Sequence, residues 1–109
     1  MRVLKFTHLA DPSHGWVKVK RSQLIRFGVL NQISGCSYER KGFVYLEEDS
    51  DASTFFLRLD TMGKPWEVIY KTTMSKASKV RSYNQFEIRQ GEAFLSGASN
   101  TYLHTKGVL

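Results

Sequence analysis

The spacing of hydrophobic and polar residues changes period in the middle of the chain. Phe43 to Leu46 form a short apolar run, which predicts a strand lying deep in a sheet. After a group of acidic residues, apolar side chains recur every three or four positions, as expected for a helix with one buried face. These are Ala52, Phe55, Phe56, Leu59 and Met62. The pattern therefore predicts a strand followed by a helix over about residues 50–62.

The ends of this helix are also marked in the sequence. Asp49 or Ser50 is expected to cap its start, where acidic side chains favour the positive end of the helix. Gly63 provides a usual C-terminal stop, and Pro65 prevents the helix from continuing. A strand at 66–71 follows closely, so we expect a right-handed crossover between two parallel neighbouring strands.

Weaker alternations predict further elements on the amino-terminal side. Residues 2–7 and 16–20 are expected to be strands, and a turn at 11–15 joins them. Ser22 is expected to cap a short helix at 21–27. The polar residues after Cys36 and the apolar run at 43–46 predict a hairpin. Gly42 would supply the positive backbone dihedral angle of its turn.

The carboxyl-terminal third has a less regular pattern. Residues 72–82 are expected to form an exposed loop, overlapping a strand predicted at 80–88. A hairpin of 93–95 with 101–103 is predicted beyond it, and the tail after His104 is expected to be disordered.

The pattern as a whole predicts an α+β fold: a single compact domain with a mixed sheet of about five or six strands packed against the main helix at 50–62 and the short helix at 21–27. The domain is expected to span 1–88, with 89–109 forming a hairpin or a partly flexible tail. The expected core is Val44, Leu46, Phe55, Phe56, Leu59, Met62, Val68 and Tyr70.

Composition supports a folded domain and limits its chemistry. The chain has 109 residues, 41% of them hydrophobic, which is well above a disordered composition. Its single cysteine, Cys36, rules out an intramolecular disulfide and suggests a reducing compartment. Charges interrupt the apolar residues at the amino terminus, so neither a signal peptide nor a membrane span is expected. We therefore expect a cytoplasmic protein without a membrane partner.

The net charge of +6 is unevenly distributed along the chain. Residues 1–46 carry eight Lys or Arg against two acids, residues 47–63 carry one against five, and residues 64–109 carry seven against three. Basic side chains with interleaved aromatic rings favour binding to nucleic acid or another anionic ligand. The predicted binding residues are Lys18, Lys20, Arg21, Arg26, Lys71, Lys76, Lys79, Arg81 and Tyr83. An ordinary solvated sheet surface has the same composition, so this alternative stays open.

The acidic group and the histidines allow two other interpretations. Glu47, Glu48, Asp49 and Asp51 suit a divalent cation, but their spacing matches no ligand loop, and capping of the helix explains them more simply. Cys36 with His8 or His14 suits thiol catalysis, whereas a lone cysteine is more often a packing residue. We therefore predict no metal, no cofactor and no catalytic residue.

Three short runs resemble a known group of proteins. His14-Gly15-Trp16, the run from Tyr45 to Asp51 with Phe55, and Arg81-Ser82-Tyr83 occur in this order in a group of short proteins encoded by bacteriophages and mobile elements. The likeness covers roughly residues 6 to 86, and it implies a setting inside a host cell without transferring an activity to any residue.

These observations lead to one functional hypothesis and two alternatives. The chain is expected to be a non-enzymatic phage-type accessory protein that binds nucleic acid or another anionic ligand through its basic residues. The first alternative is an anti-defence factor, which inhibits a host enzyme by binding it. The second is a small enzyme that uses Cys36 or the acidic group. The exposed edge of so small a sheet also allows two copies to pair as a homodimer.

Overall fold

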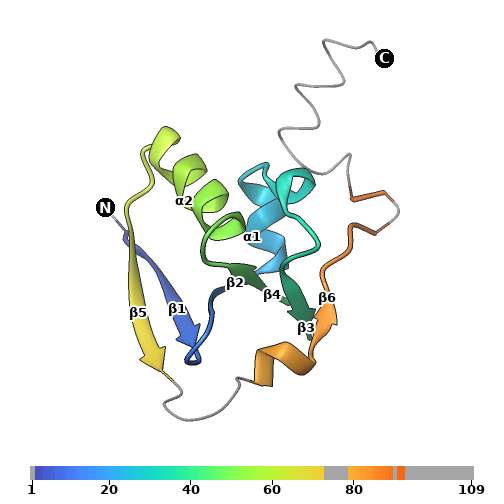
Figure 1. The fold of residues 1–109 in the computed structure, drawn as a ribbon. Coiled ribbons are helices and arrows are strands. Elements are labelled where there is room, and N and C mark those ends of the chain that lie inside the picture. Colours follow the sequence, from blue (N-terminus) through green and yellow to red (C-terminus); the bar gives the residue numbers. More distant parts are fainter. Residues whose placement is uncertain (1, 73–78, 90, 93–109) are drawn as a thin grey trace.

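The computed structural model describes residues 2–72, 79–89 and 91–92, which form one sheet with both helices on one side (Figure 1). The strands are β1 (Leu4–Ala10), β2 (Gly15–Lys20), β3 (Tyr38–Arg40), β4 (Phe43–Glu47), β5 (Trp66–Thr72) and β6 (Asn84–Gln85). The helices are α1 (Arg21–Arg26) and α2 (Asp51–Thr61), with 3₁₀ turns η1 (Leu30–Gln32) and η2 (Lys79–Ser82). The predicted α+β class, the single compact domain and the mixed sheet are confirmed.

The strand order is β5-β1-β2-β4-β3-β6, and only β1 and β5 are parallel neighbours. The predicted crossover between neighbouring strands around α2 is wrong, because β4 pairs with β2 on one edge and β3 on the other. Both edges of β4 are thus occupied by antiparallel partners. The chain must cross two strands through α2 to reach the available edge of β1, where it forms β5.

The main helix forms as expected, but its start is stabilised differently. Ser50 occupies the N-cap position, one of the two residues predicted for it, but it forms no side-chain capping bond. Glu47 Oε1 accepts the amides of Asp49 and Ser50 instead, at 2.8 and 3.0 Å. At the other end, Gly63 has a φ of 68°, which fits a glycine stop.

The short helix and the hairpin follow their local sequence signals. α1 begins after Lys20, whose amide donates to Gln23 Oε1 at 2.9 Å, so Ser22 is not its cap. In the hairpin turn, Lys41 and Gly42 have φ values of 51° and 83°. Two positive φ values are what a tight two-residue hairpin requires, and the predicted role of Gly42 is confirmed.

The core lies between the helices and the sheet face they cover. Val44, Leu46, Phe55 and Leu59 are fully buried there, as predicted, while Phe56 and Val68 are half-buried. Met62 and Tyr70 are 40% and 72% exposed, and their placement in the core is wrong. Met62 lies just past the end of α2, and Tyr70 lies on the edge strand β5.

The carboxyl-terminal segment differs most from its prediction. The strand expected at 80–88 is replaced by η2 and by the two-residue strand β6. Val80 is 1% exposed, so the expected exposed loop is wrong there, because this side chain packs against Trp16 and Tyr45. The hairpin expected at 93–95 with 101–103 lies outside the described residues. None of the described helices is long and apolar enough to span a membrane.

Candidate nucleic-acid interface

The sheet face opposite the helices is only partly covered. The strand registers align Ile69, Thr7, Lys18 and Tyr45 across four strands, which places their side chains on this one face. We call it the open face. Lys18 is half-buried and Ile69 is 49% exposed, so charged and apolar groups both reach the surface here.

A small aromatic cluster forms the centre of the open face. Trp16, Tyr45 and Val80 are buried in it, and Leu9, Tyr38, Phe43 and Tyr83 pack around them. The rings of Tyr45 and Tyr83 lie 4.9 Å apart. Burial, with Tyr83 adding to it, raises the pKa of Tyr45, because the phenolate is disfavoured in this cluster. The cluster holds η2 against the sheet.

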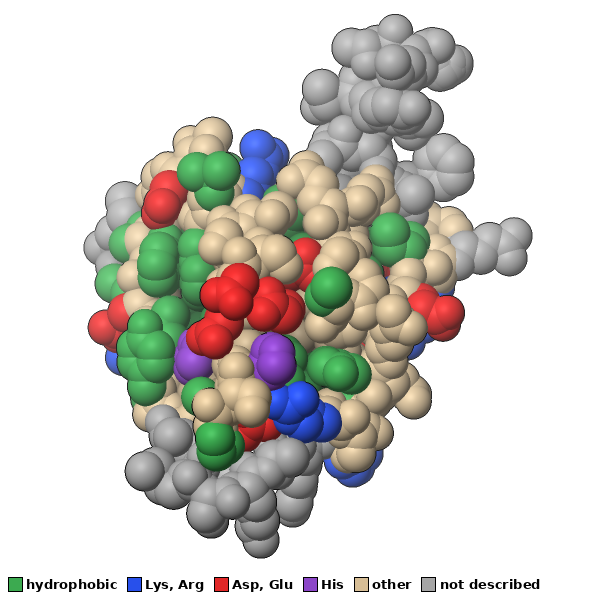
Figure 2. All heavy atoms as spheres, in the orientation of Figure 1, with side chains coloured by type: hydrophobic (Ala, Val, Ile, Leu, Met, Phe, Trp, Pro, Cys, Tyr) green, Lys and Arg blue, Asp and Glu red, His purple; other side chains and the backbone are tan. Residues whose placement is uncertain are grey.

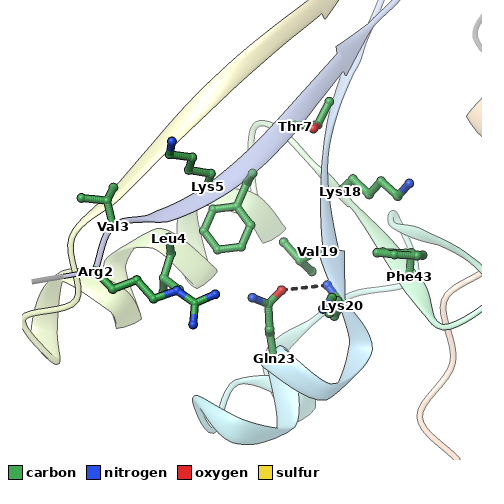
Figure 3. A pocket seen from close by; sticks show the side chains of 11 residues that line it. Arg2, Val3, Leu4, Lys5, Thr7, Lys18, Val19, Lys20, Gln23 and Phe43 are labelled. Carbon is green, nitrogen blue, oxygen red and sulfur yellow. Dashed lines mark hydrogen bonds between the residues drawn. The ribbon is translucent and has the colours of Figure 1, made fainter.

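A hollow of about 550 Å³ opens where β1 and β2 diverge (Figure 3). The two strands are paired from Thr7 opposite Lys18 to Ala10 opposite Gly15, and the pairing stops before their other ends. The polar residues around the hollow are Arg2, Lys5, Thr7, Lys18, Lys20 and Gln23, and its aromatic residues are Phe6 and Phe43. None of its described lining residues is acidic, so a cationic hollow is built into the sheet.

The lysine side chains around this hollow form weak contacts with other groups of the chain. Lys18 Nζ lies 4.2 Å from the centre of the Phe43 ring, within range of a cation–π contact. Lys5 pairs with Glu67 at 3.6 Å, but both side chains are more than half exposed, and such a surface pair contributes little. These ammonium groups therefore remain able to bind an anion.

Arg21 is the clearest departure from the predicted binding residues. It is 7% exposed, and its Nε and Nη2 donate to the two carboxylate oxygens of Glu92 at 2.7 and 2.6 Å. Its Nη1 donates to Glu39 at 2.9 Å, and Nη2 also donates to the carbonyl oxygen of Glu87. The hydrogen bond to Arg21 lowers the pKa of Glu92. Arg21 is a buried structural ion-pair partner, with Nε, Nη1 and Nη2 all bonded within the chain.

Arg81 and Tyr83 also have partners within the chain, since Arg81 lies over the Trp16 ring and Tyr83 lies against the Tyr45 ring. Arg81 binds Asp11 through two hydrogen bonds of 2.6 and 3.1 Å, and its Nη2 lies 2.8 Å from His14 Nδ1. Because a guanidinium only donates, His14 accepts through Nδ1 and carries its proton on Nε2. These contacts connect η2 to the turn after β1.

The remaining predicted cations are divided between two sides of the molecule. Lys71 is exposed, and its strand position places it on the open face with Lys18. Arg26 lies on α1 in the helical layer, with its guanidinium over the Phe27 ring. Lys76 lies outside the described residues, as does the side chain of Lys79. Of the predicted lysines, Lys18, Lys20 and Lys71 thus share the open face.

The acidic group serves the architecture of the chain: Glu47 binds two amides at the start of α2, and Asp51 lies in the first turn of that helix. Asp51 is buried and accepts from Ser34 Oγ at 2.8 Å and Ser37 Oγ at 2.5 Å. Glu48 lies 2.9 Å from His8 Nε2, and Figure 2 shows acidic side chains gathered beside the histidines. Within the described part of the chain, no group of three or more His, Cys, Asp or Glu is arranged to hold a metal ion.

The thiol alternative gains no support from the geometry. Cys36 is exposed, and its amide donates to Ser34 Oγ. His8 is held between Glu48 and the Tyr70 ring, with its Nδ1 buried and unpartnered. His14 is held by Arg81. Each member of the predicted set therefore has its own structural contacts.

Sequence reasoning missed Arg2, Lys5 and Phe43, which line the hollow. The alternation over residues 2–7 places Lys5 on one face of a strand, which was the available signal. It could not identify β2 as the neighbouring strand. Comparisons with known protein families, curated proteins and solved structures find no match to this chain.

Proposed function

We propose that the open face binds single-stranded nucleic acid, with a backbone phosphate in the hollow between β1 and β2. The observation that carries this proposal is the lining of the hollow by Arg2, Lys5, Lys18 and Lys20 without a carboxylate. Phosphate contacts by Lys and Arg provide most of the affinity in nucleic-acid binding that is not sequence-specific. The protein acts in this proposal by binding alone, as a phage-type accessory protein.

Aromatic rings beside the cations favour a single strand over a duplex. Phe43 is half-buried at the hollow, next to Lys18, and it lies at the rim of the aromatic cluster. Unpaired bases can stack on such a ring, whereas the bases of a duplex already stack on each other. A strand with its phosphate in the hollow would thus find a flat apolar surface next to it.

The inhibitor alternative has weaker support from the contacts. Its most direct binding element would be the acidic group, yet Glu47, Glu48 and Asp51 each bind a group within the chain. Binding to a host protein through these carboxylates would have to compete with the bonds that hold α2 and His8.

Fluorescence anisotropy with a labelled single-stranded oligonucleotide over a range of NaCl concentrations tests the proposal. Affinity is expected to fall steeply with salt, because each neutralised phosphate of a single strand contributes a slope of about −0.7. Lys18→Gln should weaken binding and reduce the magnitude of this slope by about 0.7, the loss of one phosphate contact. Arg26→Gln is the matched control, since it removes one charge from the helical layer.

Two outcomes would contradict the proposal. Binding that is indifferent to salt would exclude a phosphate contact, and equal losses in the two variants would show that net charge acts without the hollow. A duplex bound as tightly as the single strand would remove the role assigned to Phe43.

A further inference from the structure

The outer edge of β5 is an unpaired strand edge. β5 ends the sheet, pairs with β1 on its inner side, and has no strand partner among the described residues on its outer side. Its seven residues contain neither proline nor glycine, and Ile69 and Tyr70 are 49% and 72% exposed. Natural proteins usually protect such an edge from pairing with another chain. Of these protective devices, β5 carries the charged side chains of Glu67 and Lys71, and no proline or covering strand within the described structure.

The hydrogen-bonding groups of this edge can be assigned from its pairing with β1. The Leu4 amide donates to the carbonyl of Pro65, and Leu4 lies opposite Trp66. Odd-numbered residues of β5 therefore direct their backbone groups toward β1, and Val68 and Tyr70 direct theirs outward. An antiparallel partner must hydrogen-bond to these even-numbered positions.

The sequence of β5 complements itself in one such register. When two copies pair antiparallel about Ile69, Val68 lies opposite Tyr70, and Glu67 lies opposite Lys71. Glu67 and Lys71 then form non-hydrogen-bonded pairs, in which facing side chains approach most closely. The two-fold symmetry produces this ion pair twice.

Neighbouring registers lack this match. Pairing about Val68 sets Glu67 opposite Ile69, and pairing about Tyr70 sets Ile69 opposite Lys71. Pairing about Glu67 or Lys71 sets like charges against each other, which is destabilising. Charge therefore selects the register centred on Ile69 from those that the backbone allows.

We propose that β5 pairs antiparallel with β5 of a second copy of this chain, in the register centred on Ile69. The two-fold axis of such a pair is perpendicular to the sheet, so the two open faces lie on the same side of one continuous sheet. This homodimer does not depend on the nucleic-acid proposal. If both hold, a bound strand meets two cationic hollows.

Sedimentation velocity of the full chain from low to high micromolar concentration tests the dimer. The unchanged protein is expected to show a concentration-dependent dimer. Glu67→Lys and Lys71→Glu should each raise the dissociation constant about tenfold, because they place like charges opposite each other at both symmetric positions. The double variant Glu67→Lys with Lys71→Glu restores opposite charges and should dimerise as the unchanged chain does. Circular dichroism verifies that each variant is folded.

The double variant, which exchanges Glu67 and Lys71, makes each outcome informative. A chain that stays monomeric throughout the range overturns the proposal, as does a dimer that the single reversals leave intact. Single reversals that dissociate the dimer without rescue by the double variant overturn the register centred on Ile69. Rescue supports it, because a general effect of charge would not be reversed by exchanging two residues of one strand.

Discussion

The two faces of the sheet are built from alternate residues of the same strands, yet they have different structures. The covered face packs Val44 and Leu46 against Phe55 and Leu59 of α2, and all four are fully buried. The open face buries three side chains in its cluster, and charged groups surround them. A strand period of two thus separates a face that stabilises the fold from one that presents cations to solvent.

Two basic residues three positions apart in the sequence show the same difference. Arg21 is buried and bonded to Glu39 and Glu92, whereas Lys18 contacts an aromatic ring. Burial of a cation demands fixed partners, so Arg21 has lost the capacity to bind a ligand. The availability of a cation for binding depends on which face and which depth it occupies.

The largest difference in stability is expected between variants of two phenylalanines, one in the covered core and one on the open face. Phe55→Ala should destabilise the fold by about 3–5 kcal/mol, because it leaves a cavity in the covered core. Phe43→Ala should cost only about 1 kcal/mol, on the scale of an exposed cation–π contact. Urea denaturation measures both. Similar losses in the two variants would mean that the faces contribute equally to stability.

A second comparison uses two arginines that share Glu39. Arg21→Met should destabilise the protein by about 3 kcal/mol, because it removes the buried ion-pair partner of Glu39 and Glu92 and leaves them the exposed Arg89 side chain and backbone amides. Arg89→Met removes the second arginine partner of Glu39, but the Arg89 side chain is 61% exposed. Its loss should cost at most about 1 kcal/mol. Thermal unfolding of both variants provides the test, and equal shifts would contradict the buried role of Arg21.

Gly15 tests the packing beside His8. A Cβ atom added there would lie 2.5 Å from Glu48 Oε1 and 2.6 Å from His8 Cε1, so Gly15→Ala should cost about 1–3 kcal/mol. Gly35→Ala is the control, because its Cβ would meet the side-chain amide of the exposed Gln85, which can move aside. Chemical denaturation should show a loss for Gly15→Ala alone.

Acid is expected to weaken the contacts of Arg21. Since the pKa of Glu92 is lowered in the folded protein by its hydrogen bond to Arg21, folding gains stability above the ordinary glutamate value of 4.5. That contribution is lost as the pH falls through the folded pKa. The melting temperature should decrease as the pH is lowered through the acid range, and it should decrease less steeply in Glu92→Gln. The same dependence of melting temperature on pH in Glu92→Gln would contradict the assignment of this loss to Glu92.

High pH is expected to destabilise the aromatic cluster of the open face. Burial raises the pKa of Tyr45, so its contribution is complete below the ordinary tyrosine value of 10.0 and is lost as the pH rises through the folded pKa. Tyr45→Phe keeps the ring and should flatten this alkaline loss. The difference in phenolate absorbance between the unchanged chain and Tyr45→Phe during a pH titration separates Tyr45 from the four other tyrosines. A Tyr45 pKa at the ordinary tyrosine value would contradict the burial of Tyr45 in the cluster.

The sequence predicted a helix or turn correctly where that element depends on residues close together in the chain. The apolar spacing of α2, the glycine stop at Gly63 and the turn at Lys41 and Gly42 follow from the geometry of a few consecutive residues. Val80 was misassigned because its burial depends on Trp16 and Tyr45, which are distant in sequence.

The tertiary structure alone decided which residues form the candidate site. Strand pairing placed Thr7 opposite Lys18 and left the hollow where their strands diverge, with Lys5 and Lys18 both in its lining. It also buried Arg21 against Glu92, 71 residues away in the chain. The sequence by itself determined the basic charge and the alternation that sorts side chains onto two faces. Contacts between distant residues decided which of those charges remain available to a ligand, because burial and pairing are properties of the assembled sheet.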